Sequence, residues 1–111
     1  MSGDTVTGAN WVRVASLSQC VESGCIHAVS PHGHDVVVIR WEDEIYALED
    51  NCSHQDFPLS DGSMENGQIE CVFHGAKFDV RTGKATQLPA IKPVRTYPVR
   101  IEGDEIFIQL D

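Results

Sequence analysis

Two short clusters of thiol and imidazole side chains are the part of the sequence most suited to chemistry. Cys52 and His54 form the first cluster, and Cys71 and His74 form the second. Each cluster offers one cysteine and one histidine at nearly adjacent positions. Thiolates combined with imidazoles are a ligand set that zinc and iron–sulfur centres use. We therefore predict that these four side chains bind one metal centre.

Spacing alone leaves two kinds of metal centre open. A mononuclear zinc site accepts two cysteines and two histidines. A [2Fe–2S] cluster accepts the same set when both cysteines bind one iron and both histidines bind the other. The ligands are divided evenly between two segments separated by residues 55–70, so two loops could approach a cluster from opposite sides. The sequence therefore favours the binuclear cluster over zinc.

The spacing of the ligands also resembles a known motif. Cys-x-His followed at a distance by Cys-x-x-His-Gly resembles the Rieske iron–sulfur motif, and the resemblance runs from about residue 36 to the C-terminus. It includes Leu59-Ser60-Asp61-Gly62, Gly75-Ala76-Lys77-Phe78-Asp79-Val80-Arg81-Thr82-Gly83-Lys84, Leu88-Pro89-Ala90 and Tyr97-Pro98-Val99. This set is similar to the Rieske-type ferredoxins of bacterial multicomponent aromatic-ring-hydroxylating dioxygenases.

The resemblance implies a fold and a role for each ligand. It implies an all-β Rieske fold of small antiparallel, sandwich-like sheets, with a loop subdomain holding the cluster at one tip. Cys52 and Cys71 would bind the inner iron, and His54 and His74 the outer, solvent-facing iron. Pro89 falls where the family has a third loop that covers the cluster. We expect one Rieske domain over residues 1–111, with cluster-binding loops at about 51–91.

Departures from the family pattern imply a low reduction potential. The second loop commonly has a proline where this chain has Val72, which should make the loop less rigid but removes no ligand. High-potential Rieske proteins bridge the two loops with a disulfide, and Phe57 and Phe73 occupy those positions here. They also have a serine and a tyrosine whose hydroxyls bond the cluster sulfurs, and these positions are Ala76 and Phe78. All these differences favour a low-potential carrier.

The pattern of residues along the chain predicts short strands separated by turns. Runs rich in β-branched and aromatic residues predict strands at 11–14, 36–39, 45–48, 78–80, 99–101 and 106–108. The polar links at 41–44, 81–84 and 102–105 predict three hairpins. Residues 16–24 could form a helical turn or two, and residues 51–67 are predicted to be a functional loop. The predicted fold class is therefore all-β.

Charge excludes some partners and suggests others. The chain has 8 Lys and Arg against 17 Asp and Glu, a formal net charge of −9. This argues against nucleic acid and against an anionic membrane surface. No Lys or Arg occurs between Trp41 and Ala76. That segment is either a solvated acidic face or a docking surface for a basic partner.

The cysteines bear on the cellular compartment. No apolar run is long enough to span a membrane, and residues 1–10 lack the pattern of a signal peptide. We therefore expect a cytoplasmic protein whose thiols stay reduced. Its four cysteines are predicted to be metal ligands or buried thiols rather than disulfides. Cys20 and Cys25 lie outside the motif and are expected to be buried thiols.

A cluster with four protein ligands has no open position for substrate, so the sequence predicts an electron carrier and not an enzyme. It also lacks a nucleotide-binding fingerprint and an arrangement of nucleophile and base. By resemblance, a flavin-containing, NAD(P)H-dependent reductase supplies electrons and a terminal oxygenase receives them, with the carrier as a monomer. The alternatives are a small Rieske subunit of another reductase, such as nitrite reductase, and a zinc-stabilised binding module. A redox sensor would need an output element, and none is recognisable.

Overall fold

The computed structural model describes residues 11–51, 58–72, 75–87 and 92–110. Strands and single 3-10 turns make up the regular structure of these segments, and among them no helix is long and apolar enough to cross a membrane. The elements in chain order are β1 (Trp11–Ser16), η1 (Leu17–Gln19), β2 (Ile26–Val29), η2 (Pro31–Gly33), β3 (Val36–Trp41), β4 (Glu44–Glu49), η3 (Leu59–Asp61), β5 (Ser63–Glu65), β6 (Gln68–Glu70), β7 (Lys77–Asp79), β8 (Ala85–Gln87), β9 (Thr96–Tyr97), β10 (Val99–Glu102) and β11 (Glu105–Gln109).

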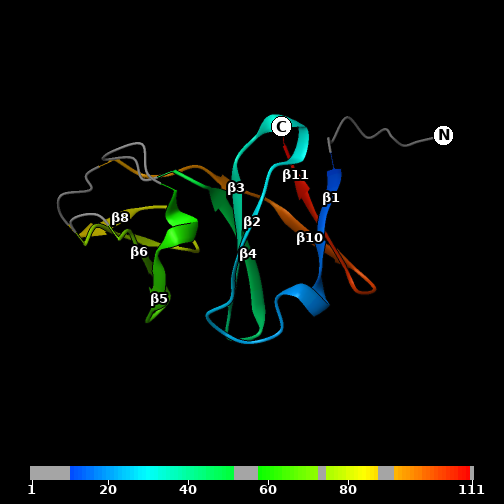
Figure 1. The fold of residues 1–111 in the computed structure, drawn as a ribbon, viewed down its shortest axis with the longest axis horizontal. Coiled ribbons are helices and arrows are strands. Elements are labelled where there is room, and N and C mark those ends of the chain that lie inside the picture. The colour runs from blue at the N-terminus through cyan, green and yellow to red at the C-terminus, as the bar shows by residue number, and fades with distance from the viewer. Residues whose placement is uncertain (1–10, 52–57, 73–74, 88–91, 111) are drawn as a thin grey trace.

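The strands form three antiparallel sheets arranged along the long axis of the molecule (Figure 1). The first sheet has the order β1-β11-β10, the second β2-β3-β4-β9, and the third β5-β6-β7-β8. The second sheet lies between the other two, with the third sheet, green to yellow, at one end (Figure 1). The prediction of an all-β fold with small antiparallel sheets is confirmed.

The central strand β3 is buried on both faces. Residues 36–39 have no exposed surface. Val37 and Ile39 pack in a core shared with the third sheet, whereas Val36 and Val38 pack in cores shared with the first sheet. Successive side chains of a strand point to opposite faces, so both faces of this strand must be apolar. This explains why the sequence has a continuous apolar run here and no alternation.

The three predicted hairpins are confirmed, two of them with shorter turns than the polar runs suggested. β3 and β4 pair through to Trp41 and Glu44, and β10 and β11 pair through to Glu102 and Glu105. Each of these turns therefore contains two residues. β7 pairs with β8 around the predicted turn at 81–84.

Four strands were not predicted, namely β2, β5, β6 and β9. β2 pairs along β3, although residues 26–29 gave no clear signal. The expected loop over 51–67 is wrong in its second half, where η3 and β5 form. Asn66 and Gly67 both have positive φ, 52° and 77°, and make the two-residue turn from β5 to β6. An Asn-Gly pair flanked by alternating apolar residues, here Met64 and Ile69, is a strong hairpin signal, so the sequence did contain the information.

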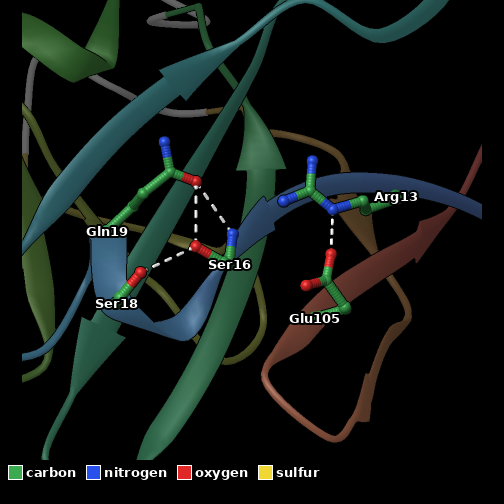
Figure 2. Close-up of polar contacts among 5 residues, drawn as sticks. All are labelled: Arg13, Ser16, Ser18, Gln19 and Glu105. Atoms are coloured by element: carbon green, nitrogen blue, oxygen red, sulfur yellow. Dashed lines mark hydrogen bonds and ion pairs between the residues drawn. The ribbon is translucent and has the colours of Figure 1, made fainter.

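Polar contacts fix the end of β1 and the start of η1 (Figure 2). The backbone N–H of Ser16 donates to Oε1 of Gln19 at 2.8 Å, and the Ser16 and Ser18 hydroxyls lie 2.9 Å apart. An ion pair between Arg13 and Glu105 joins β1 to β11 (Figure 2). The chain therefore leaves β1 in a defined direction, and this direction determines where Cys20, the residue after η1, lies.

Cys20 and Cys25 form a disulfide, which corrects the expectation that both are thiols. Cys20 follows η1 and donates its N–H to the Leu17 carbonyl at 3.0 Å. Gly24, with φ of +92°, then turns the chain back before β2. The two Cα atoms are thereby brought to 5.4 Å, inside the range that a disulfide spans. The expectation of thiols rested on the reducing cytoplasm, whereas the local turn at Gly24 brings the two cysteines together.

Candidate metal centre

Cys71 is the one predicted ligand within the described residues. Cys52, His54 and His74 lie outside them. Cys71 directly follows β6, is 1% exposed, and packs in the core shared by the second and third sheets. A buried thiol at the end of a strand suits the prediction that Cys71 binds the inner iron.

The second cluster loop is the tip of the hairpin between β6 and β7. The backbone N–H of Cys71 donates to the carbonyl of Ala76 at 2.7 Å, which closes the loop at its base. Gly75 has φ of +71°, a conformation that favours glycine. Val72, by contrast with its neighbour Cys71, is 63% exposed. The loop therefore turns Cys71 inward while its next residue faces solvent.

The first cluster loop is closed at its base by side-chain contacts. Asp50 follows β4, and its carboxylate accepts hydrogen bonds from both the backbone N–H and the hydroxyl of Ser60, each at 2.7 Å. Leu59, next to Ser60, has no exposed surface and packs in the same core as Cys71. The described ends of the first loop are thus held to the core that contains the second-loop cysteine.

The bases of the two loops touch through backbone. A Cβ added to Gly62 would lie 2.0 Å from the carbonyl oxygen of Glu70, the residue before Cys71. Only a residue without a side chain allows η3 to approach β6 this closely. The resemblance pointed to Leu59-Ser60-Asp61-Gly62 but gave no reason for the glycine, and the structure supplies one.

The backbone of the turn from β7 to β8 also lies close to the segment that follows the predicted covering loop in the sequence. The carbonyl of Gly83, in the turn from β7 to β8, accepts the N–H of Val94 at 2.8 Å. A Cβ at Gly83 would lie 2.2 Å from the Val94 carbonyl oxygen. Val94 therefore holds the chain against the third sheet after the segment that contains Pro89, which itself lies outside the described residues.

The charged side chains around the third sheet are of both signs, and most of them are exposed. Lys77 pairs with Glu65 at 3.2 Å between β7 and β5. The Arg81 guanidinium donates to the Tyr46 hydroxyl at 3.3 Å, and this hydrogen bond raises the pKa of the arginine. Tyr46 is in β4, and the contact therefore also ties the third sheet to the second.

The described residues fit the predicted cluster and offer no competing site. Among them, no group of three or more Cys, His, Asp or Glu side chains lies close enough to hold a metal ion. The buried Cys71 thiol, the closed hairpin loop and the meeting of the two loop bases suit a centre bound by two loops. The donor set of two thiolates and two imidazoles is the set that a Rieske cluster takes.

Comparisons with known proteins give the same family. The Rieske [2Fe-2S] domain matches residues 10–98. The ferredoxin component of biphenyl 2,3-dioxygenase from Rhodococcus jostii (strain RHA1) is 46% identical over 76 residues, covering 68% of this chain and 71% of the relative. The solved ferredoxin of carbazole 1,9a-dioxygenase from Nocardioides aromaticivorans IC177 superposes with a TM-score of 0.83 at 41% identity, covering 88% of this chain and 95% of that one.

A second solved structure contains such a ferredoxin with its partner. It is a complex of reduced oxygenase and oxidized ferredoxin in carbazole 1,9a-dioxygenase, and it superposes with a TM-score of 0.84 at 33% identity. The match covers 89% of this chain and 92% of that one. Both solved chains are thus matched over nearly their whole length. Motif, fold and relatives agree, and the chain belongs to the Rieske [2Fe–2S] domain family.

Proposed function

We propose that Cys52, His54, Cys71 and His74 hold the [2Fe–2S] cluster of this Rieske protein. The observation that carries the assignment is the placement of Cys71. It is buried at the base of a closed hairpin loop, and the backbone of the preceding residue touches Gly62, which follows the first loop. Two loops that converge in this way can supply one thiolate and one imidazole each.

The chain acts as an electron carrier and not as an enzyme. When bound, a Rieske cluster takes up and releases one electron. The protein's part is to bury the cysteine end of the centre in the core and to leave the other end accessible to a partner. With all four cluster positions occupied by side chains, no site is left on the iron for substrate.

We further propose that the electron acceptor is a terminal oxygenase and that the donor is a flavin-containing, NAD(P)H-dependent reductase. The relatives are ferredoxin components of dioxygenase systems, and one solved relative is in complex with its oxygenase. The same relatives favour a free-standing carrier over a small subunit of another reductase such as nitrite reductase. We propose that the carrier works as a monomer in the cytoplasm, where NAD(P)H is available, and apart from nucleic acid and membrane.

The aerobically purified protein tests the cluster assignment. We expect two iron and two sulfide per chain, a red-brown colour that bleaches with dithionite, and a Rieske EPR signal in the reduced state. A colourless protein containing zinc would instead establish the zinc-stabilised module. Reduction of a purified terminal oxygenase by the dithionite-reduced carrier then tests the proposed acceptor.

The reduction potential should lie near the bottom of the Rieske range, at about −150 mV. Hydrogen bonds to the cluster sulfurs favour the reduced state, and Ala76 and Phe78 provide no hydroxyl for them. Both side chains are fully buried, Ala76 directly before β7 and Phe78 within it. A donor bond worth about 1 kcal/mol raises a one-electron potential by roughly 40 mV.

The Ala76→Ser and Phe78→Tyr double variant should therefore have a higher potential, by less than about 100 mV. Potentiometry followed by EPR measures the shift, and iron content shows that the cluster still assembles. An unchanged or lower potential in a fully loaded double variant would refute this account of the low potential.

Docking to the oxygenase should weaken as salt rises. Charges on a protein surface are screened beyond about 8 Å at physiological ionic strength. Because no Lys or Arg occurs between Trp41 and Ala76, we expect a negative field near the first loop. The second-order rate of electron transfer should fall by about tenfold from low to high salt, mainly through association.

Two single variants locate the effect. Asp61 is exposed in η3, directly after the first loop, whereas Asp104 is exposed in the turn between β10 and β11 at the opposite end of the molecule (Figure 1). Asp61→Asn should lower the low-salt rate by about twofold, and Asp104→Asn should leave it unchanged. A rate independent of salt would mean apolar docking, for which Val72 and Pro58 are exposed.

A further inference from the structure

The side chain of Asp50 joins the two described ends of the first cluster loop. Its Oδ1 accepts the backbone N–H of Ser60, and its Oδ2 accepts the Ser60 hydroxyl, both at 2.7 Å. We call this pair of hydrogen bonds the Asp50–Ser60 clasp. The clasp encloses residues 51–59, which include the predicted ligands Cys52 and His54.

Each half of the clasp is attached to a rigid part of the fold. The backbone N–H of Asp50 donates to the carbonyl of Asp35 at 3.0 Å, and the preceding N–H of Glu49 donates to the carbonyl of Arg95 at 2.8 Å. These contacts fix Asp50 to the second sheet. On the other side, Ser60 lies next to the fully buried Leu59. The clasp therefore joins two fixed points and not two mobile ones.

The hydrogen bonds of the clasp are strong because their acceptor is an ionised carboxylate. Hydrogen bonds to an ionised carboxylate are roughly twice as strong as those between neutral groups. Asp50 and Ser60 are both partly buried, so solvent does not readily replace either bond. Removal of the carboxylate would leave the Ser60 N–H without its partner, and such a loss is costly in a partly buried place.

We propose that Asp50 is a positioning residue for the [2Fe–2S] cluster. Its carboxylate closes the first loop and thereby holds Cys52 and His54 where they can bind iron together with the second loop. This role rests on the ligand assignment under Proposed function. Asp50 does not itself bind the metal, and its effect passes through the hydrogen bonds to Ser60.

Cluster loss to a chelator tests the role. The loaded wild-type, Asp50→Ala, Asp50→Asn and Asp35→Ala proteins are incubated with excess EDTA, and the decay of the visible absorption is followed. Asp35 is the matched control, because its exposed carboxylate accepts the Ser30 hydroxyl at 3.3 Å and, among the described residues, makes no side-chain bond to the ends of the first loop. Its removal changes the charge by the same amount as removal of Asp50.

Asp50→Ala should lose its cluster about tenfold faster than wild type, as expected from one unpaired donor. Asp50→Asn should stay within about threefold of wild type, because its amide oxygen still accepts the Ser60 N–H and its amide nitrogen can donate to the hydroxyl. Asp35→Ala should match wild type. Equal decay of the Asp50→Ala and Asp35→Ala proteins would overturn the proposal, as would an Asp50→Asn protein no better than Asp50→Ala.

Hydrogen exchange separates this inference from the proposed function. In a peptide covering residues 58–62, the Ser60 amide should exchange slowly in wild type and in Asp50→Asn, and faster in Asp50→Ala. Fast exchange in wild type would overturn the clasp even if the cluster is present. A wild-type protein without a Rieske spectrum would overturn the ligand assignment, and the positioning role would fall with it, whatever the exchange shows.

Discussion

The His74→Ala protein should lose the reduced-state Rieske EPR signal completely, and so should His54→Ala. A Rieske cluster takes two cysteines on one iron and two histidines on the other, so removal of one imidazole leaves the second iron without one of its two protein ligands. The fold should largely persist, because the buried apolar residues that the structure describes in the first and second sheets pack against one another. EPR of the dithionite-reduced protein, together with iron and sulfide analysis, measures the loss.

The matched control for this loss is the Cys20→Ser and Cys25→Ser double variant. It removes two cysteines outside the predicted ligand set, which form a disulfide between η1 and β2, and it should keep the full EPR signal and iron content. A normal Rieske signal in His74→Ala would show that another residue completes the cluster. Loss of the signal in the double variant would also contradict the ligand assignment, because it would show that the cluster requires Cys20 or Cys25.

Gly62→Ala should be strongly destabilising and should reduce cluster content. The added methyl group would lie 2.0 Å from the Glu70 carbonyl oxygen and 3.1 Å from the Leu59 carbonyl oxygen. Backbone atoms cannot move away as a flexible side chain can, so η3 and β6 must separate and pull the two loop bases apart. Overpacking of this kind costs about 3 kcal/mol. Chemical denaturation and iron analysis measure the two effects.

Gly103→Ala separates this clash from the loss of a glycine as such. Gly103 has φ of +60° in the turn between β10 and β11, and a Cβ there meets nothing within 4 Å. Its replacement should cost only about 1 kcal/mol of backbone strain and should leave the cluster intact. The account of Gly62 would be wrong if its alanine variant were as stable and as fully loaded as Gly103→Ala.

The sequence predicted features that depend on local pattern. Hairpins around residues 42–43 and 103–104 were visible because polar turns separate short apolar runs. The four ligands were visible because a cluster requires particular residue types at close spacing. Cys71 is the predicted ligand that lies within the described residues, and it is buried, as expected for a ligand of the inner iron. All four ligand assignments stay predictions.

The contacts that support the first loop could not be predicted in the same way. The Asp50–Ser60 clasp and the approach of Gly62 to Glu70 join residues eight to ten positions apart, and they depend on how three sheets pack. The disulfide between Cys20 and Cys25 was mispredicted because the expectation rested on the reducing environment of the cytoplasm. The turn that brings the two cysteines together is visible only in the backbone conformation. β2 was missed because its residues are only partly buried and lack a clean alternation.

The burial of β3 on both faces has a consequence for strand alignment. In a sheet with one wet face, a slip of one residue would expose apolar side chains and would be rejected. In β3 such a slip would exchange Val36 and Val38 with Val37 and Ile39, all β-branched aliphatic residues of similar size. Polarity therefore discriminates weakly between the two alignments. The two-residue turn at 42–43, where Glu42 has φ of 59°, must do much of the selection. The turn at 42–43 therefore helps to determine which side chains of β3 face the third sheet, whose strand β6 ends directly before Cys71.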